Sequence, residues 1–125
     1  MRTILFLNDQ LPLRNFTAAY LRRNQFFVQE APPGAAIDLI QRNSFDIVMA
    51  DLNFPENITL VDVLAYHHRV WPEKGRLLCT FFDSDKLGQV CRIINTTYVR
   101  KPTPLKQILL TIQSFQPWSK LMPYQ

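Results

Sequence analysis

Polar side chains that could act together on a phosphoryl group stand near the ends of four apolar segments. They are Asn8-Asp9 after "TILFL", Asp51 after "FDIVMA", Thr80 in "RLLCTFF" and Lys101 after "TTYV". Carboxylates in close contact repel each other, and a hard cation such as Mg²⁺ relieves that repulsion. An ammonium group facing them attracts phosphoryl oxygens, and a hydroxyl adds a hydrogen bond. Phosphoryl transfer to a carboxylate requires these groups, because it depends mainly on positioning and neutralising charge.

The segments that carry these residues alternate with segments of helical period. Strands are expected at 3–7, 26–30, 45–50, 76–82 and 96–99. Five such β–α units imply a doubly wound parallel sheet with helices on both faces, an α/β fold. The carboxyl ends of parallel strands lie at one edge of the sheet, where ligands bind in such folds. The polar residues are therefore expected to converge at that edge.

Spacings of three and four between apolar residues predict the helices. In the first helix, which has Pro12 in its first turn, the residues expected on the inner side are Leu13, Phe16, Tyr20 and Leu21. In the second they are Ala36, Ile37 and Ile40, and in the third, which closes at Trp71-Pro72, they are Leu60, Val61 and Leu64. In the last helix they are Leu105, Ile108, Leu109 and Ile112. A weaker helix is expected over 84–94. Thr103 is expected to cap the last helix, with Pro104 at its first position.

The composition fits one globular domain. The chain has 125 residues, and none of its apolar runs reaches the ~18 residues of a membrane-spanning helix. The N-terminus turns polar after four apolar residues, too soon for a signal peptide. We therefore expect a cytoplasmic domain over residues 1–116 that does not enter a membrane, with 117–125 as a tail or the beginning of a linker.

Other kinds of site receive less support. Cys79 and Cys91 lie in apolar surroundings and are expected to be reduced and packed. His67 and His68 are adjacent, so they cannot hold one metal ion, and both are expected on a helix surface. The net charge of +4 is a feature that nucleic-acid-binding domains share. The basic residues are scattered, however, which argues against nucleic-acid binding through this domain.

Five motifs occur in order along residues 2–115. They are "ILFLND", "VQEAPPGAAIDLI", "DIVMADLNFP", "LLCT" and "YVRKP". In this order and spacing the chain resembles the receiver domains of response regulators in two-component signalling. The resemblance implies a flavodoxin-like fold, with five parallel strands in the order 2-1-3-4-5 flanked by five helices.

The resemblance also implies a role for each polar residue. Asp51 would accept a phosphoryl group from a phosphohistidine on a histidine kinase or a histidine phosphotransfer protein. Asp9, Asp51 and the backbone carbonyl of Asn53 would bind Mg²⁺, the implied cofactor, with a weak contribution from Asn8 through water. Lys101 would pair with the phosphoryl oxygens. The domain would be a signalling module rather than an enzyme.

A switch follows from the same resemblance. Thr80 would hydrogen-bond the new phosphoryl group, and Tyr98 would move inward behind it. This movement would remodel the surface of the fourth helix, fifth strand and fifth helix, where a downstream effector binds. A cis Lys101-Pro102 bond is also implied. The basic residues expected near this surface, which favour an acidic partner, are Lys86, Arg92, Arg100 and Lys106. The oligomeric state, a homodimer included, stays open.

Three positions depart from the family pattern. Asn8 replaces an acid, so we expect weaker Mg²⁺ binding than at a site with three acids. Phe81 replaces the small residue after the switch threonine and is expected to narrow access to Asp51. Thr59 stands where a glycine usually follows the acceptor-loop proline. An interaction module that keeps the fold but works without phosphorylation is therefore the main alternative. The lone aspartate of "DLN" disfavours a haloacid-dehalogenase-type phosphatase, and "NDQLPL" disfavours a flavin carrier.

Overall fold

A computed structural model of the chain describes residues 1–9 and 16–115. The strands of this part are β1 (Arg2–Asn8), β2 (Phe26–Ala31), β3 (Ile47–Leu52), β4 (Gly75–Thr80) and β5 (Thr97–Arg100). Its α-helices are α1 (Phe16–Arg23), α2 (Ala36–Arg42), α3 (Leu60–Val70), α4 (Asp85–Ile93) and α5 (Leu105–Gln113). Two 3₁₀ helices, η1 (Pro33–Ala35) and η2 (Pro55–Asn57), precede α2 and α3. The predicted strands agree with these bounds to within two residues.

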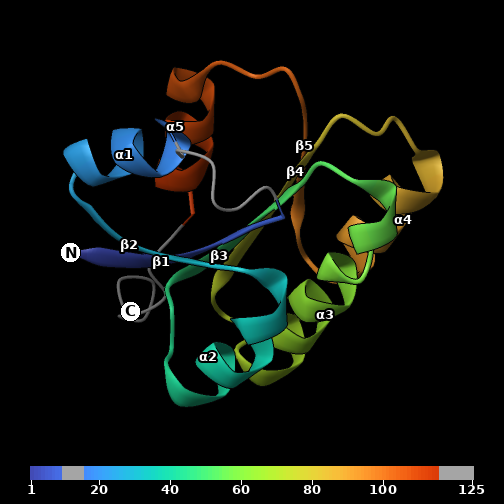
Figure 1. The fold of residues 1–125 in the computed structure, drawn as a ribbon, viewed down its shortest axis with the longest axis horizontal. Coiled ribbons are helices and arrows are strands. Elements are labelled where there is room, and N and C mark those ends of the chain that lie inside the picture. Colours follow the sequence, from blue (N-terminus) through green and yellow to red (C-terminus); the bar gives the residue numbers. More distant parts are fainter. Residues whose placement is uncertain (10–15, 116–125) are drawn as a thin grey trace, which may run out of the picture.

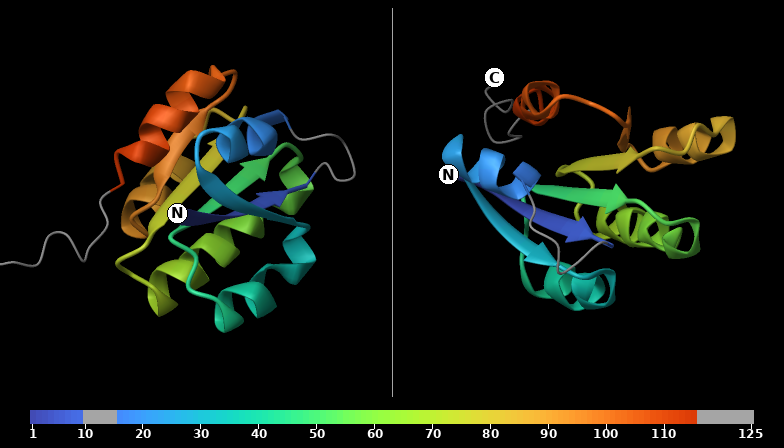
Figure 2. Two further views of the ribbon diagram at one scale, coloured as in Figure 1. Left: turned by 90° about the vertical axis from the view of Figure 1, so that its left-hand side faces the viewer. Right: turned by 45° about the horizontal axis from the view of Figure 1, so that its top comes forward.

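The strands form one parallel sheet in the order β2-β1-β3-β4-β5. Helices α1 and α5 cover one face of the sheet, and α2, α3 and α4 cover the other (Figures 1 and 2). The sequence prediction of a doubly wound sheet with strand order 2-1-3-4-5 is confirmed. Since all strands are parallel, their carboxyl ends lie along one edge, as the candidate site requires.

The central strand β3 is apolar on both faces because the sheet is covered on both sides. Val48, Ala50 and Leu52 pack in the cluster beneath α2, α3 and α4. Ile47 and Met49 pack in the cluster beneath α1 and α5. Successive strand residues point to opposite faces, so the residue after Ala50 points to the α1–α5 side. This alternation fixes the direction of the carboxylate at position 51.

Three predictions about the helices are wrong. Helix α5 begins at Leu105 with Pro104 as its N-cap, and no side chain caps it. Thr103 does not cap the helix, because its hydroxyl donates a hydrogen bond to the carbonyl of Arg100 in the β5–α5 connection. Ile37 does not face the core, since α2 buries only Ala36 and Ile40. Phe16, also expected on an inner side, is 67% exposed at the start of α1, which buries only Ala18 and Leu21.

The prediction that both histidines lie on the helix surface is also wrong. His67 is fully buried, and Arg76 at the start of β4 is buried beside it. The guanidinium of Arg76 lies 3.1 Å from Nδ1 of His67 and donates to the carbonyls of Trp71 and Ile94. These carbonyls follow the last turns of α3 and α4. Arg76 therefore joins the carboxyl ends of both helices to the sheet beneath them.

Some predictions fall outside the described residues. Pro12 and Leu13, expected in the first helix, belong to the segment 10–15, and the expected tail 117–125 also lies beyond the described range. Cys79 and Cys91 are buried free thiols, as predicted. Among the described residues, every helix is too short or too polar to cross a bilayer.

Candidate functional site

The strand register brings the predicted site residues to one edge of the sheet. Asn8, the last residue of β1, lies opposite Asp51 of β3. Leu52 lies opposite Thr80, which ends β4. Thr80 lies in turn opposite Arg100, the residue before Lys101. The convergence expected from the apolar pattern is therefore present.

Asp51 and Lys101 form an ion pair at this edge. The Lys101 ammonium contacts Oδ1 of Asp51, and each side chain is only 17% exposed. The same ammonium donates to Oδ1 of Asn53 at 2.8 Å. The Lys101 peptide N–H donates to the carbonyl of Thr80 at 2.7 Å, and the Lys101-Pro102 bond is cis, as expected. Backbone contacts at the ends of β4 and β5 thus place the ammonium against the carboxylate.

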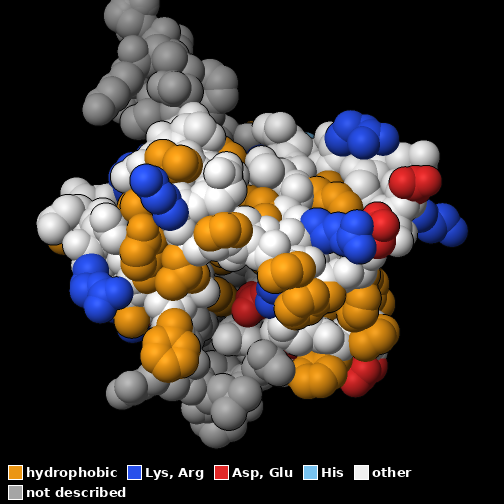
Figure 3. Space-filling model, turned by 90° about the horizontal axis from the view of Figure 1, so that it is seen from above, with side chains coloured by type: hydrophobic (Ala, Val, Ile, Leu, Met, Phe, Trp, Pro, Cys, Tyr) orange, Lys and Arg blue, Asp and Glu red, His pale blue; other side chains and the backbone are white. Residues whose placement is uncertain are grey.

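Phe81, the first residue after β4, borders the ion pair. The Lys101 ammonium lies 5.1 Å from the centre of the Phe81 ring, within the range of a cation–π contact. The ring itself is 53% exposed. Seen from above, an acidic and a basic group lie together in a hollow bordered by hydrophobic side chains (Figure 3). Phe81, which was expected to narrow access to Asp51, thus lies beside the lysine that pairs with that carboxylate.

Asp9 contacts the loop between β3 and α3 rather than Asp51. Its carboxylate accepts hydrogen bonds from the peptide N–H groups of Asn53 and Phe54. It also accepts from the side-chain amides of Asn53, at 2.8 Å, and Asn57, at 3.2 Å. Asn53 thereby links the two charged groups of the site, donating to Asp9 and accepting from Lys101.

The two proposed switch residues lie on the α4 side of the site. The fully buried Thr80 accepts a hydrogen bond from the N–H of Phe82 at 3.3 Å. The hydroxyl of Tyr98 donates to the carbonyl of Phe82. The Tyr98 ring packs near Gly88 of α4. Thr80 and Tyr98 are therefore linked through a single residue of the β4–α4 loop.

A small cavity of about 90 Å³ extends from the ion pair into the α1–α5 side of the sheet. Its walls include Asp51, Lys101, Cys79 and Thr103. Burial, and to a lesser degree the charge of Asp51, raises the pKa of the Cys79 thiol to about 12. Cys79 is therefore a neutral wall of the cavity at physiological pH and not a nucleophile.

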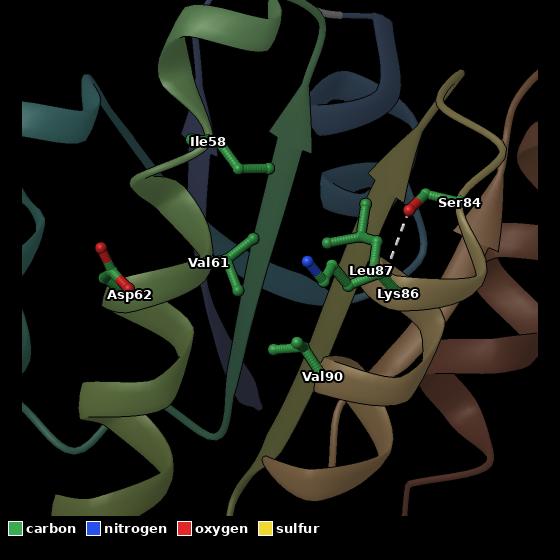
Figure 4. Close-up of a pocket in the computed structure, with 7 residues that line it drawn as sticks. All are labelled: Ile58, Val61, Asp62, Ser84, Lys86, Leu87 and Val90. Atoms are coloured by element: carbon green, nitrogen blue, oxygen red, sulfur yellow. Dashed lines mark hydrogen bonds between the residues drawn. The ribbon is translucent and has the colours of Figure 1, made fainter.

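A larger apolar groove, of about 350 Å³, lies between α3 and α4 (Figure 4). Val61, Leu87 and Val90 line it, and the Lys86 side chain reaches over it. Ile58, at its upper end, follows the loop that contacts Asp9. The charged pair lies in the smaller cavity, so size does not identify the site of the chemistry.

Asn57 and Phe54 belong to the site although sequence reasoning did not select them. Both lie in "NFPEN", which follows the proposed acceptor. Asparagine and proline after a strand indicate a tight loop, and asparagine side chains commonly bond to neighbouring groups in loops. The pattern does not identify the acceptor of such a bond. Asp9, 48 residues from Asn57, is that acceptor here.

No protein-family model matches the chain, and a search of curated proteins finds no match. Solved structures do match. A CheY-like response regulator receiver domain protein from Methanospirillum hungatei gives a TM-score of 0.80 at 19% identity, covering 90% of this chain and 91% of its own. Chemotaxis protein CheY4 of Vibrio cholerae gives 0.79 at 21% identity, covering 93% and 99%. The chain has the fold of a response-regulator receiver domain.

Two other receiver-fold structures were determined with ligands. TrrA from Thermotoga maritima, in complex with Mg²⁺ and BeF, matches with a TM-score of 0.78 at 16% identity, covering 93% of this chain and all of its own. A response regulator from Burkholderia pseudomallei, with a phosphorylated aspartate, calcium and citrate, gives 0.78 at 21% identity, covering 91% of this chain and 68% of its own. At these identities the likeness establishes the receiver fold of the present chain, and its chemistry has to be argued from its own residues.

The oxygen donors at the edge of this receiver fold suit Mg²⁺ chemically. Asp9, Asp51 and the carbonyl of Asn53 supply hard ligands and no competing sulfur or imidazole. The described residues contain no cluster of three or more carboxylate, imidazole or thiol side chains that could hold a metal ion. With Asn8 in place of an acid, two carboxylates remain. The donor set fits an ion that keeps several of its waters.

Proposed function

We propose that this chain is a phosphoacceptor receiver domain of a two-component or phosphorelay system, with Asp51 as the acceptor. The observation that carries the proposal is the pairing of Asp51 with Lys101 at the carboxyl edge of the sheet. A carboxylate used only to cap a loop would bond to loop N–H groups, as Asp9 does. Asp51 instead faces an ammonium group and a cavity. It is therefore the carboxylate suited to nucleophilic attack.

The reaction exchanges one bond to phosphorus for another. An oxygen of Asp51 attacks the phosphorus of a phosphohistidine on the donor protein, and an O–P bond forms while the P–N bond breaks. The electron pair of that bond stays on the imidazole nitrogen, which takes up a proton. Lys101, already in contact with Asp51, stabilises the phosphoryl oxygens with its positive charge. The product is an acyl phosphate on Asp51 and a free histidine.

Mg²⁺ would be held by Asp9, Asp51 and the carbonyl of Asn53, with Asn8 acting through water. The bound ion would neutralise charge on the carboxylates and on the phosphoryl group. The protein's own contribution is to fix the direction of Asp51 through the β3 register and to limit solvent access with the Phe81 ring.

Thr80 and Tyr98 would transmit the change to a partner surface. The Thr80 oxygen accepts from Phe82 N–H, which leaves its proton available for a phosphoryl oxygen. A shift of Thr80 would change the position of Phe82, whose carbonyl holds the Tyr98 hydroxyl. A downstream effector would bind the face formed by α4, β5 and α5. Exposed basic residues on or beside these elements, which favour an acidic partner, are Lys86, Arg92, Arg100 and Lys106.

Phosphorylation from a small-molecule donor tests the proposal. The protein is incubated with Mg²⁺ and acetyl phosphate, and the modified residue is located by mass spectrometry of the peptides. We expect one phosphoryl group on Asp51, and none in Asp51→Asn. Asp38→Asn, which changes an exposed carboxylate of α2, is the matched control and should be modified like the wild type. Modification of another residue, or of none, contradicts the proposal.

The alternative is a receiver-fold interaction module that works without phosphorylation. It is favoured by the hydrogen bonds that occupy Asp9 and by the Phe81 ring beside Lys101. It predicts no phosphoryl group on Asp51 and no spectral response to Mg²⁺ with beryllofluoride. A histidine kinase or phosphotransfer partner belongs to the first proposal and not to this one, whereas the expected cytoplasmic location is common to both.

A further inference from the structure

The carboxylate of Asp9 is saturated by its own protein. Ionised aspartate offers about four lone-pair positions. Four N–H donors reach Asp9, from the backbone and side chain of Asn53, the backbone of Phe54 and the side chain of Asn57. A metal ion needs at least one of these positions. It can bind Asp9 only after a donor has left.

We propose that the loop 53–57 is a latch on Asp9 and that Asn57 sets how tightly the site binds Mg²⁺. The inference rests on the proposed Mg²⁺-dependent function and deepens it. Asn57 contributes the longest of the four donor contacts, 3.2 Å, and contributes it through a side chain. Its amide can rotate away without any movement of the backbone. Asn57 is therefore the donor that Mg²⁺ displaces first.

The latch couples Mg²⁺ binding to the conformation of the loop 53–57. In its closed form, Asn53 bridges Asp9 and Lys101, and Lys101 pairs with Asp51. Release of Asp9 loosens this chain of contacts at one end. A ligand shifts a two-state equilibrium only by its difference in affinity for the two states. Here the difference is large, because the closed form blocks the metal ligand with hydrogen bonds.

Ile58 offers a place to observe the movement. It follows Asn57, is 47% exposed and lies at the upper end of the groove between α3 and α4 (Figure 4). An Ile58→Cys variant can be labelled there with an environment-sensitive thiol dye. Cys79 and Cys91 are buried, and burial raises the pKa of both thiols, so neither competes for the dye at neutral pH.

The experiment compares Mg²⁺ affinity, measured by calorimetry, in wild type and Asn57→Ala. Loss of one hydrogen bond to a charged group corresponds to about a tenfold change in equilibrium. We therefore expect Asn57→Ala to bind Mg²⁺ about tenfold more tightly. Asn43→Ala, which loses a bond to the Leu39 carbonyl at the end of α2, should bind like the wild type. The dye at position 58 should respond to Mg²⁺, with its midpoint shifted equally by Asn57→Ala.

The latch proposal is wrong if wild type and Asn57→Ala bind Mg²⁺ with equal affinity, or if the dye signal does not change when Mg²⁺ is added. Acetyl phosphate labelling of the same proteins separates this failure from that of the proposed function. If Asp51 is phosphorylated but Asn57→Ala leaves Mg²⁺ affinity unchanged, the latch is wrong and the function stands. If Asn57→Ala binds Mg²⁺ more tightly and Asp51 stays unmodified in both proteins, the latch stands and the function is wrong.

Discussion

The Phe81 ring and the Lys101 ammonium lie 5.1 Å apart, and the same ammonium pairs with Asp51. The Phe81 ring is exposed although the lysine is largely buried, and a cation–π contact at an exposed site contributes about 0.5–1 kcal/mol. The ring thus holds the lysine near the carboxylate and occupies part of the approach to it. In the proposed function, one aromatic side chain would affect both the arrival of the donor and the attack of water on the product.

We predict that Phe81→Ala shortens the lifetime of the phosphoryl group on Asp51. Loss of ~0.5–1 kcal/mol from the contact with Lys101 corresponds to roughly a two- to fivefold faster decay. Wider access for water acts in the same direction. The measurement is the rate of loss of the acyl phosphate, followed by intact-protein mass spectrometry after the donor is removed.

Phe27→Ala is the matched control for this prediction. Phe27 is also an exposed phenylalanine, but it lies near the beginning of β2, away from the carboxyl edge of the sheet. Its replacement should leave the decay rate unchanged. The same acceleration in both variants would show that the effect is general loosening of the domain and not the removal of a ring above Lys101.

Asn8→Asp should tighten Mg²⁺ binding by on the order of tenfold, because it adds a carboxylate beside Asp51, its partner in the strand register. Without Mg²⁺ the added charge repels Asp51 and should lower the thermal midpoint. Saturating Mg²⁺ should remove that deficit. Titration of tyrosine and tryptophan fluorescence gives the affinity. An affinity equal to that of wild type would refute the role assigned to Asn8.

The convergence of Asp51 and Lys101 could be predicted because it depends on a simple rule. Apolar strands followed by polar residues define the carboxyl edge of a parallel sheet, whichever side chains fill the rest of the fold. The contacts of Asp9 could not be predicted in this way. They depend on how closely the loop 53–57 approaches Asp9, which lies 48 residues before Asn57 in the sequence. No periodic pattern of residues encodes that distance.

His67 shows a second limit of sequence reasoning. Apolar spacing identifies the side of α3 that faces the core, and a histidine beside that stripe has no hydrophobic signature. The partner that accommodates it, Arg76, is itself polar and lies at the start of a strand. Patterns of apolar residues select positions that are buried for hydrophobic reasons. A polar side chain that is buried because it contacts another buried polar side chain leaves no such pattern.

Two glycines should respond to alanine in opposite directions. In α4, a Cβ at Gly88 would lie 3.7 Å from the Tyr98 ring, an ordinary contact, so Gly88→Ala should stabilise the domain by up to about 1 kcal/mol through helix propensity. At the start of β4, a Cβ at Gly75 would lie 2.7 Å from the Phe115 ring. Gly75→Ala should therefore destabilise by about 1–3 kcal/mol. Urea denaturation measures both, and shifts of the same sign would contradict the packing at one site.

The stability of the domain should fall as the pH drops below neutrality, because of His67. Burial, reinforced by the charge of Arg76, lowers the pKa of His67 to about 3. In the unfolded chain the pKa is about 6.5, so between these values only the unfolded state binds the proton. Stability is thus greatest above pH ~6.5 and declines as the pH falls, by at most about 1.4 kcal/mol per pH unit.

His67→Gln isolates this contribution, because glutamine does not titrate and its amide oxygen can accept from Arg76. We expect the wild-type free energy of unfolding, measured in urea at pH 7, 6 and 5, to fall more steeply than that of His67→Gln. Asp46, whose pKa is also lowered, adds a loss of the same sign. It titrates mainly below this range, since its ordinary pKa lies near 4. Parallel pH profiles for the two proteins would contradict the prediction. They would mean that His67 binds a proton in the folded state as readily as in the unfolded state, although it is buried beside the Arg76 guanidinium.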